Sequence, residues 1–254
     1  MNRTAFSLVE LSIVLVILGL LTGGILAGQS LIHAAELRSV STGAQRYAAA
    51  INAFRDKYFF LPGDMNNAVA FWGQAATCPG DSTHIGTGTQ TCNGDGDGII
   101  AAAGADANSD ENFRSWQHLA NAGLIEGSYN GVDMGTNHYT ATSANTPTGR
   151  IASSLWMLES WGSRTGNGNF FDGVYNNMLL LGLATASTDP QPLLTPPDMW
   201  NIDTKMDDGK PGTGRVYGRF WGTCTNAASG TNYSADYVLT SATAGCEFML
   251  RLFN

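Results

Sequence analysis

The first quarter of the chain contains two hydrophobic patterns that follow each other without a break. An apolar run with no charged residue covers residues 11–28, about the length that a membrane-spanning helix needs. Beyond Leu31 the pattern becomes amphipathic, because apolar residues recur at alternating spacings of three and four. These residues are Leu37, Val40, Ala44, Tyr47, Ile51, Phe54 and Tyr58. The pattern predicts one continuous helix that ends before Pro62, apolar all round at first and then buried on one face.

One carboxylate, Glu10, lies at the start of the apolar run. An ionised carboxylate in hydrocarbon costs roughly 2.5 to 3.5 kcal/mol on insertion scales, so a plain membrane anchor does not explain it. A secretory signal peptide is an alternative, since residues 27–29 imitate a small-residue cleavage site after an apolar core. Glu10 instead favours an assembly in which this carboxylate meets a positive partner.

Residues 5–10, together with the apolar run behind them, resemble the N-terminal motif of type IV prepilins, a family that includes the pseudopilins of type II secretion. The sequence departs from that motif at Ala5, where the family has Gly. The resemblance implies that a prepilin peptidase cuts between Ala5 and Phe6 and methylates the new amino group. It also implies that Glu10 pairs with the Phe6 amino group of a neighbouring subunit.

The resemblance divides the chain into three parts. Residues 1–5 form a leader, residues 6–28 a transmembrane stem, and residues 29–254 a globular head that begins with an amphipathic half-helix, 29–60. Arg3 before the apolar run and net-acidic sequence after it predict a cytoplasmic N-terminus in a bacterial inner membrane. In the mature filament the head would be periplasmic or extracellular.

Short elements without regular alternation follow the helix and predict an α+β fold with an antiparallel sheet. The resemblance makes this fold pilin-like: a long N-terminal helix packed on the sheet, with long loops. We expect helices at residues 67–72, from a cap near 108–111 to about 122, and at 198–206 after a linker at 190–197. We expect strands at residues 150–158, 177–184, 214–220, 235–240 and 246–253.

Composition excludes several classes of function. The chain has 254 residues, a net charge of −8 and only 13% charged residues, which argues against nucleic-acid binding. Its four histidines are scattered, and the sequence contains no phosphate-binding loop, nucleophile motif or zinc pattern. We therefore expect no enzymatic activity, and an anchored periplasmic hydrolase is the least supported alternative.

The four cysteines form two sequence-local pairs. In an exported protein an even number of cysteines predicts disulfides, although four cysteines allow three connectivities. We expect local pairing, of Cys78 with Cys92 and of Cys224 with Cys246.

The segment after Cys92 predicts a calcium site. Oxygen-bearing side chains alternate there with glycines, as in the first half of an EF-hand loop, which would use the ligands Asn93, Asp95, Asp97 and Ile99. The twelfth position is Gly104 rather than Glu, so a bidentate carboxylate would have to come from Asp106, Asp110 or Glu111. The alternative is a series of solvated Asp-Gly turns. The pair at 207–208 is a weaker second candidate, for which a helix-ending turn is the preferred interpretation.

The sequence thus predicts a structural subunit of a type IV pilus or a type II secretion pseudopilus. Its expected partners are other pilin or pseudopilin subunits, prepilin peptidase and the inner membrane. Residues 194–211 also resemble a segment of large pilin-like bacterial proteins, which extends the resemblance beyond the stem. The alternative is a large minor pilin or adhesin whose loops, residues 78–148, bind a surface or a partner.

Overall fold

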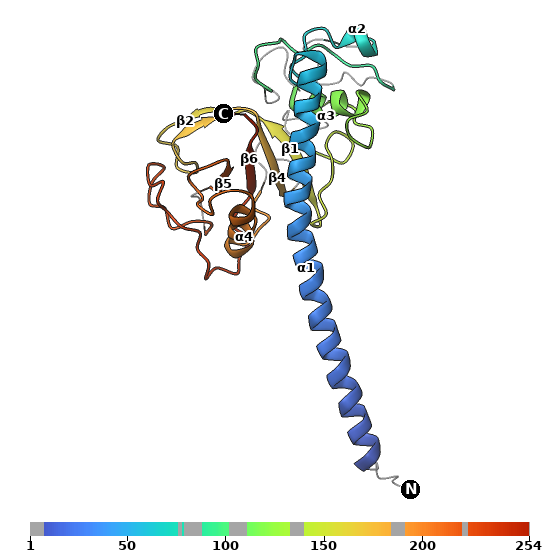
Figure 1. Ribbon diagram of the computed structural model, residues 1–254, viewed down its shortest axis with the longest axis vertical. Helices are drawn as coiled ribbons and strands as arrows, with labels where there is room; N and C mark the ends of the chain where they lie inside the picture. Colours follow the sequence, from blue (N-terminus) through green and yellow to red (C-terminus); the bar gives the residue numbers. More distant parts are fainter. Residues whose placement is uncertain are drawn as a thin grey trace.

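The computed structural model describes residues 8–75, 78, 88–101, 111–132, 140–183, 191–219 and 223–253. Within them the fold is α+β, with one long helix, a four-stranded antiparallel sheet and a small hairpin (Figure 1). The helices are α1 (Leu8–Tyr58), α2 (Val69–Trp72), α3 (Glu111–Asn121) and α4 (Pro196–Met206). The strands are β1 (Ser154–Glu159), β2 (Gly162–Arg164), β3 (Gly173–Tyr175), β4 (Met178–Leu183), β5 (Val216–Tyr217) and β6 (Phe248–Arg251).

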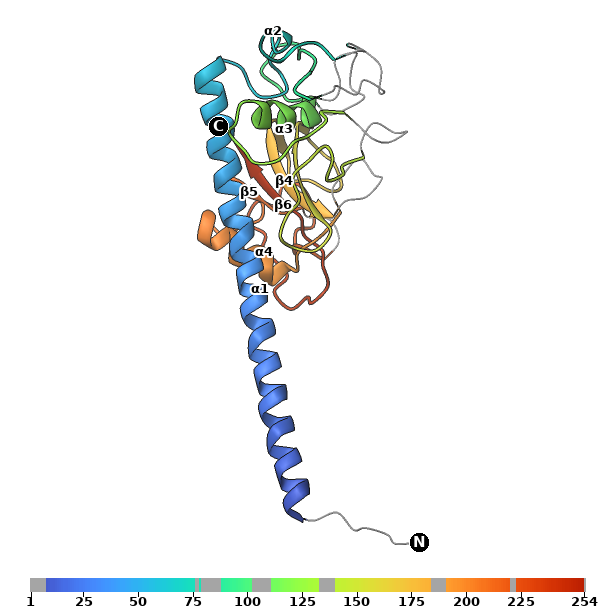
Figure 2. The same ribbon diagram turned by 90° about the vertical axis from the view of Figure 1, so that its right-hand side faces the viewer.

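The long helix is confirmed as one uninterrupted element. The N-terminal part of α1 projects from the head as a stem, and its C-terminal part lies along the head (Figures 1 and 2). The buried residues of α1 are those of the predicted face with Ala50 added, except that Tyr58 is half-buried. Phe59, at a φ of 62°, ends the helix, and its amide still donates to the Arg55 carbonyl at 2.8 Å. The turn that follows passes through Gly63 at a φ of 89°.

The sheet has the strand order β1-β4-β6-β5, and every pairing is antiparallel. Alternate residues of its strands face α1 and form the main core with α1, α3 and α4. The other face packs under the hairpin β2–β3, where Met178, Leu180 and Met249 contact Phe170 and Tyr175. Because both faces of β4 are covered, its sequence is a continuous apolar run rather than an alternation.

The contact between stem helix and sheet is close. Tyr47 of α1 packs edge-on against Trp116 of α3 and Trp156 of β1, with ring centroids 5.0 and 5.3 Å apart. Gly43, one turn earlier, faces the same ring of Trp156, and a Cβ at this glycine would lie 2.8 Å from it. The head is therefore fixed on the second half of α1 by aromatic rings that leave no space for an added side chain.

Several boundaries differ from the predicted ones, and one predicted strand is wrong. Residues 235–240 form no strand and contribute one isolated bridge, Thr225 with Tyr237. The strand expected at 150–158 begins only at Ser154, since Ser153 adopts a φ of 61°. The segment taken as a linker supplies the start of α4: the Thr195 side chain accepts from the Asp198 amide, and two prolines fit the first turn, where no amide donor is needed.

Two further differences concern short elements. The helix expected at 67–72 is confined to α2, and the strand expected at 214–220 to the two residues of β5. The hairpin β2–β3 was not predicted, because three-residue strands are too short to show an alternating pattern.

Both disulfides follow the expected local pairing. Cys78 is bonded to Cys92, and Cys224 to Cys246. The second bond joins two segments beside the main core, and both of its cysteines are fully buried.

Candidate functional site

The first candidate site is the free half of α1. This helix is long and apolar enough to cross a membrane, and none of its most apolar stretch is buried by the rest of the chain. Its large side chains from Leu8 to Ile32 are exposed. A Cβ placed on Gly19, Gly23, Gly24 or Gly28 would meet nothing within 4 Å. The stem thus presents an exposed apolar surface long enough to span a membrane, with small residues at spacings that allow close helix approach.

Glu10 lies in the first turns of this exposed stem. Ala5 and Phe6, the residues of the predicted processing site, lie outside the described residues.

The second candidate site is a loop cluster of three carboxylates. Single ligand oxygens of Asp64, Asp95 and Asp97 lie within 4.8 Å of one another. Asp64 is 1% exposed, whereas Asp95 and Asp97 are exposed. Such a group offers carboxylate oxygens from two segments of the chain, and calcium prefers hard oxygen ligands of this kind.

Asp64 organises this cluster, and the sequence prediction missed it. Its two side-chain oxygens accept the amides of Gly96 and Gly98 at 2.7 and 3.0 Å. The loop packs closely here, since a Cβ at Gly94 would lie 2.4 Å from the Gly63 carbonyl oxygen. The only sequence signal was an acidic residue directly after the helix-ending Pro62-Gly63, some thirty positions before the glycine-rich loop.

Glu111 lies beside the cluster and holds the loop. One of its oxygens accepts the Asp95 amide at 3.1 Å and the other the Ala101 amide at 2.9 Å. Of the other predicted ligands, Asn93 turns its amide oxygen to the Val69 amide at 2.9 Å. Ile99 donates its own amide to Asp97 at 2.7 Å. Asp106 and Asp110 lie outside the described residues.

The surroundings of Asp64 and Glu111 disfavour the ionised form of both carboxyl groups. Burial raises the pKa of Asp64 to about 6, against the lowering effect of its two backbone hydrogen bonds. Burial also raises the pKa of Glu111 to about 7, and the charges of Asp64 and Asp95 add to it. Without a cation Asp64 and Glu111 therefore bind protons at a higher pH than ordinary carboxyl groups do, and a bound cation would displace these protons.

His118 connects this loop to the core. Its Nδ1 accepts the Gly63 amide at 3.0 Å, and its Nε2 lies 2.9 Å from the Thr91 hydroxyl. Burial lowers the pKa of His118 to about 3, so the ring is neutral and can accept the Gly63 hydrogen bond. His118 thus serves packing and loop anchoring, and it is not placed to act as a base.

A second acidic group, Asp203, Asp207 and Asp208, lies at the end of α4. Its oxygens accept hydrogen bonds from the fold, as those of Asp64, Asp95 and Asp97 also do. Asp203 accepts the Tyr237 hydroxyl at 2.8 Å and the Gly209 amide at 3.2 Å. The Asp207 side chain accepts the Arg215 and Val216 amides, and that of Asp208 accepts the Lys210 amide and the Thr213 hydroxyl. These contacts agree with a helix-ending turn that ties α4 to β5.

Comparison with known proteins returned no match: neither a family model, nor a curated protein, nor a solved structure is significantly similar to this chain. Any functional conclusion therefore depends on the residues and geometry described above.

Proposed function

We propose that this chain is a structural, non-enzymatic subunit of a type IV pilus or of a related pseudopilus, assembled through α1. The main support for the proposal is that the two halves of a single 51-residue helix have different surroundings. Its second half is built into the core of the head, whereas its first half is apolar, exposed and free of contacts with the head. A helix of this kind can be stored in a membrane and then transferred into a bundle of like helices without refolding the head.

The proposed sequence of events assigns a part to each segment. The apolar stem holds the precursor in the inner membrane, and a prepilin peptidase removes the leader before Phe6. The stem then leaves the lipid for a filament in which small residues let neighbouring stems approach. Glu10 is tolerated in the apolar environment because the amino group of a neighbour's Phe6 neutralises it.

The role of Glu10 can be tested by replacement. Glu10→Ala should leave membrane insertion intact, because removing a lone charge from an apolar helix favours insertion. Filament formation should fall to background, because the partner of the neighbouring amino group is gone. Sheared filaments and the membrane fraction would be quantified by immunoblot in the same cells.

Glu36→Ala is the matched control. Glu36 lies on the same helix beyond the apolar run, 4.0 Å from His33, so its removal should change filament yield little. Normal filaments with Glu10→Ala would remove the assembly role from Glu10. Loss of filaments with both variants would point to a general effect of helix charge.

We further propose that the loop cluster binds calcium through Asp64, Asp95 and Asp97. The support is the convergence of three carboxylates, one of them buried and held by two amides of the loop it orders. Glu111 would then act beside the ion as a loop anchor through its two backbone hydrogen bonds. The ion would order the loop at the tip of the head and leave the stem unaffected.

A further inference from the structure

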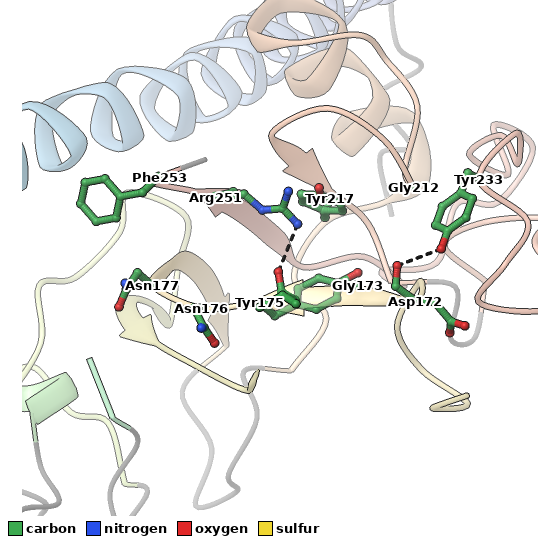
Figure 3. A pocket seen from close by; sticks show the side chains of 11 residues that line it. Asp172, Gly173, Tyr175, Asn176, Asn177, Gly212, Tyr217, Tyr233, Arg251 and Phe253 are labelled. Atoms are coloured by element: carbon green, nitrogen blue, oxygen red, sulfur yellow. Dashed lines mark hydrogen bonds between the residues drawn. The ribbon is translucent and has the colours of Figure 1, made fainter. Parts of the chain in front are cut away.

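A cavity of about 660 Å³ opens in the head between β3 and the end of the four-stranded sheet (Figure 3). The aromatic, polar and charged residues that line it include Asp172, Tyr175, Asn176, Tyr217, Tyr233 and Arg251. None of the lining residues belongs to α1 or to the Asp64 cluster. The volume lies within the range of pockets that take small organic ligands.

The aromatic walls of the cavity are held in place before any ligand arrives. Tyr175 and Tyr217 meet edge-to-face with ring centroids 5.5 Å apart, and the Tyr175 hydroxyl donates to the Phe171 carbonyl at 2.9 Å. Tyr233 stands at the rim with 42% of its surface exposed. Its hydroxyl donates to the Asp172 carbonyl at 3.0 Å (Figure 3). The rim therefore offers one oriented aromatic face to a guest.

Two charged side chains line the cavity, the cation of Arg251 and the carboxylate of Asp172, and the Asp172 carboxylate accepts the Gly166 amide at 3.0 Å. The Arg251 guanidinium lies over the Tyr217 ring, 4.8 Å from the centroid, and one nitrogen donates to the Val174 carbonyl at 3.1 Å. Across the described part of the chain, no carboxylate forms an ion pair with it. A guanidinium has five N–H donors and stays charged. Arg251 uses donors for the Val174 carbonyl and the Tyr217 side chain, and the others can serve an anionic guest.

Asn176 adds an acceptor. Its side-chain oxygen is buried and has no hydrogen-bond partner among the described residues, although Asn176 lines the cavity. A buried acceptor without a partner is costly. Because this oxygen has almost no accessible surface, a guest hydroxyl reaches it only when the Asn176 side chain turns toward the cavity. The cavity thus combines an aromatic face, a fixed cation and an unsatisfied acceptor.

We propose that this cavity binds an acidic saccharide, a uronate-type sugar whose carboxylate contacts Arg251. A sugar ring has an apolar face that can lie on Tyr233 and hydroxyl groups that can donate to Asn176. A uronate also has a planar carboxylate that matches the two-pronged geometry of a guanidinium. The site goes beyond assembly of a filament: it would give the head a ligand of its own, in a cavity whose walls, among the described residues, include none of 78–148.

The test is direct binding of a galacturonate trisaccharide to the full chain in detergent micelles, by isothermal titration calorimetry and saturation-transfer NMR. We expect saturable binding, with transfer from tyrosine ring protons to the sugar. The same trisaccharide with methyl-esterified carboxylates should bind at least about tenfold more weakly, since a charged hydrogen-bonding group is lost. Inorganic phosphate at the same concentration should not compete.

Two variants locate the site. Arg251→Gln should weaken binding about tenfold or more, whereas Arg150→Gln, the same charge change at an exposed position, should leave it unchanged. Because Arg251 also contacts Val174, Tyr233→Ala at the exposed rim serves as a second variant and should weaken binding severalfold. Tyr233→Phe, which loses the same hydrogen bond to Asp172 but keeps the ring, should retain binding. No saturable binding, equal binding of the ester, competition by phosphate, or unchanged binding in Tyr233→Ala would each overturn the proposal. None of these results would bear on filament assembly.

Discussion

Calcium should raise the melting temperature of the full chain in detergent, and Asp64→Asn should abolish that increase. At a calcium concentration a hundred times the dissociation constant, binding to the folded state alone contributes about 2.7 kcal/mol. Asp64 is the decisive residue because its oxygens hold the Gly96 and Gly98 amides as well as facing Asp95 and Asp97. Thermal unfolding would be followed by circular dichroism in calcium and in chelator.

The increase should depend on pH in a defined direction. The folded-state pKa values of Asp64 and Glu111, about 6 and about 7, lie above their unfolded values. The folded chain therefore binds more protons, and without calcium its stability falls as pH rises through these values. Calcium replaces those protons, so its stabilising effect should be larger at pH 7.5 than at pH 5.

Comparing the melting temperatures in calcium and in chelator at the same pH cancels the contributions of other titrating groups. Burial of His118 acts in the opposite sense, and Asp203, with a pKa of about 7, lies in the other acidic group, but neither belongs to the proposed site. Asp208→Asn is the matched control, because it removes a carboxylate from the group at the end of α4. That variant should keep the calcium response. Identical melting curves in calcium and chelator would show that the loop binds no calcium and is a series of Asp-Gly turns.

Glu247→Gln should lower the free energy of unfolding by about 3 to 5 kcal/mol, the usual cost of removing one partner from a buried ion pair. Glu247 and Arg219 are 2% and 4% exposed, and a Glu247 carboxylate oxygen accepts from the Arg219 Nε. The guanidinium also lies over the Phe170 ring, 4.5 Å from its centroid, under the hairpin β2–β3. The substitution leaves the arginine charge buried and its carboxylate partner gone.

An exposed ion pair in the same head provides the control. The Lys210 Nζ lies 2.5 Å from an Asp236 carboxylate oxygen, but the two side chains are 45% and 63% exposed. Asp236→Asn should therefore cost at most about 1 kcal/mol. Denaturant unfolding of both variants would measure the difference. Equal costs for the two carboxylates would contradict the view that the Arg219–Glu247 pair is desolvated and fixes the hairpin on the sheet.

The sequence was most informative where one physical rule acts over many residues. The helical face of α1 was predictable because burial against a sheet requires apolar residues every three or four positions over about six turns. The core strands β1, β4 and β6 were recognisable as apolar runs, with errors at their ends. The sequence of residues 235–240 resembles that of a strand. In the structure the Tyr237 side chain is buried and its hydroxyl donates a hydrogen bond to Asp203.

The sites were less predictable, because they join residues far apart in the chain. Local spacing pointed to Asp95 and Asp97, but Asp64 reaches them only through the turn at Gly63 and the docking of the loop. Asn93 had the expected spacing, and the fold uses its oxygen for the Val69 amide instead. The cavity beside Arg251 had no sequence signal, since its walls come from β3, β5, β6 and the loops next to them.

The central claim, that the stem is a processed prepilin helix, is tested most directly by the mass of the mature N-terminus. The protein would be isolated from the membrane and filament fractions of cells that carry the assembly machinery, and its N-terminal peptide analysed by mass spectrometry. We expect a chain that begins at Phe6 with one methyl group on its amino nitrogen. A chain that still begins at Met1, or one that begins after Ala27, would contradict it.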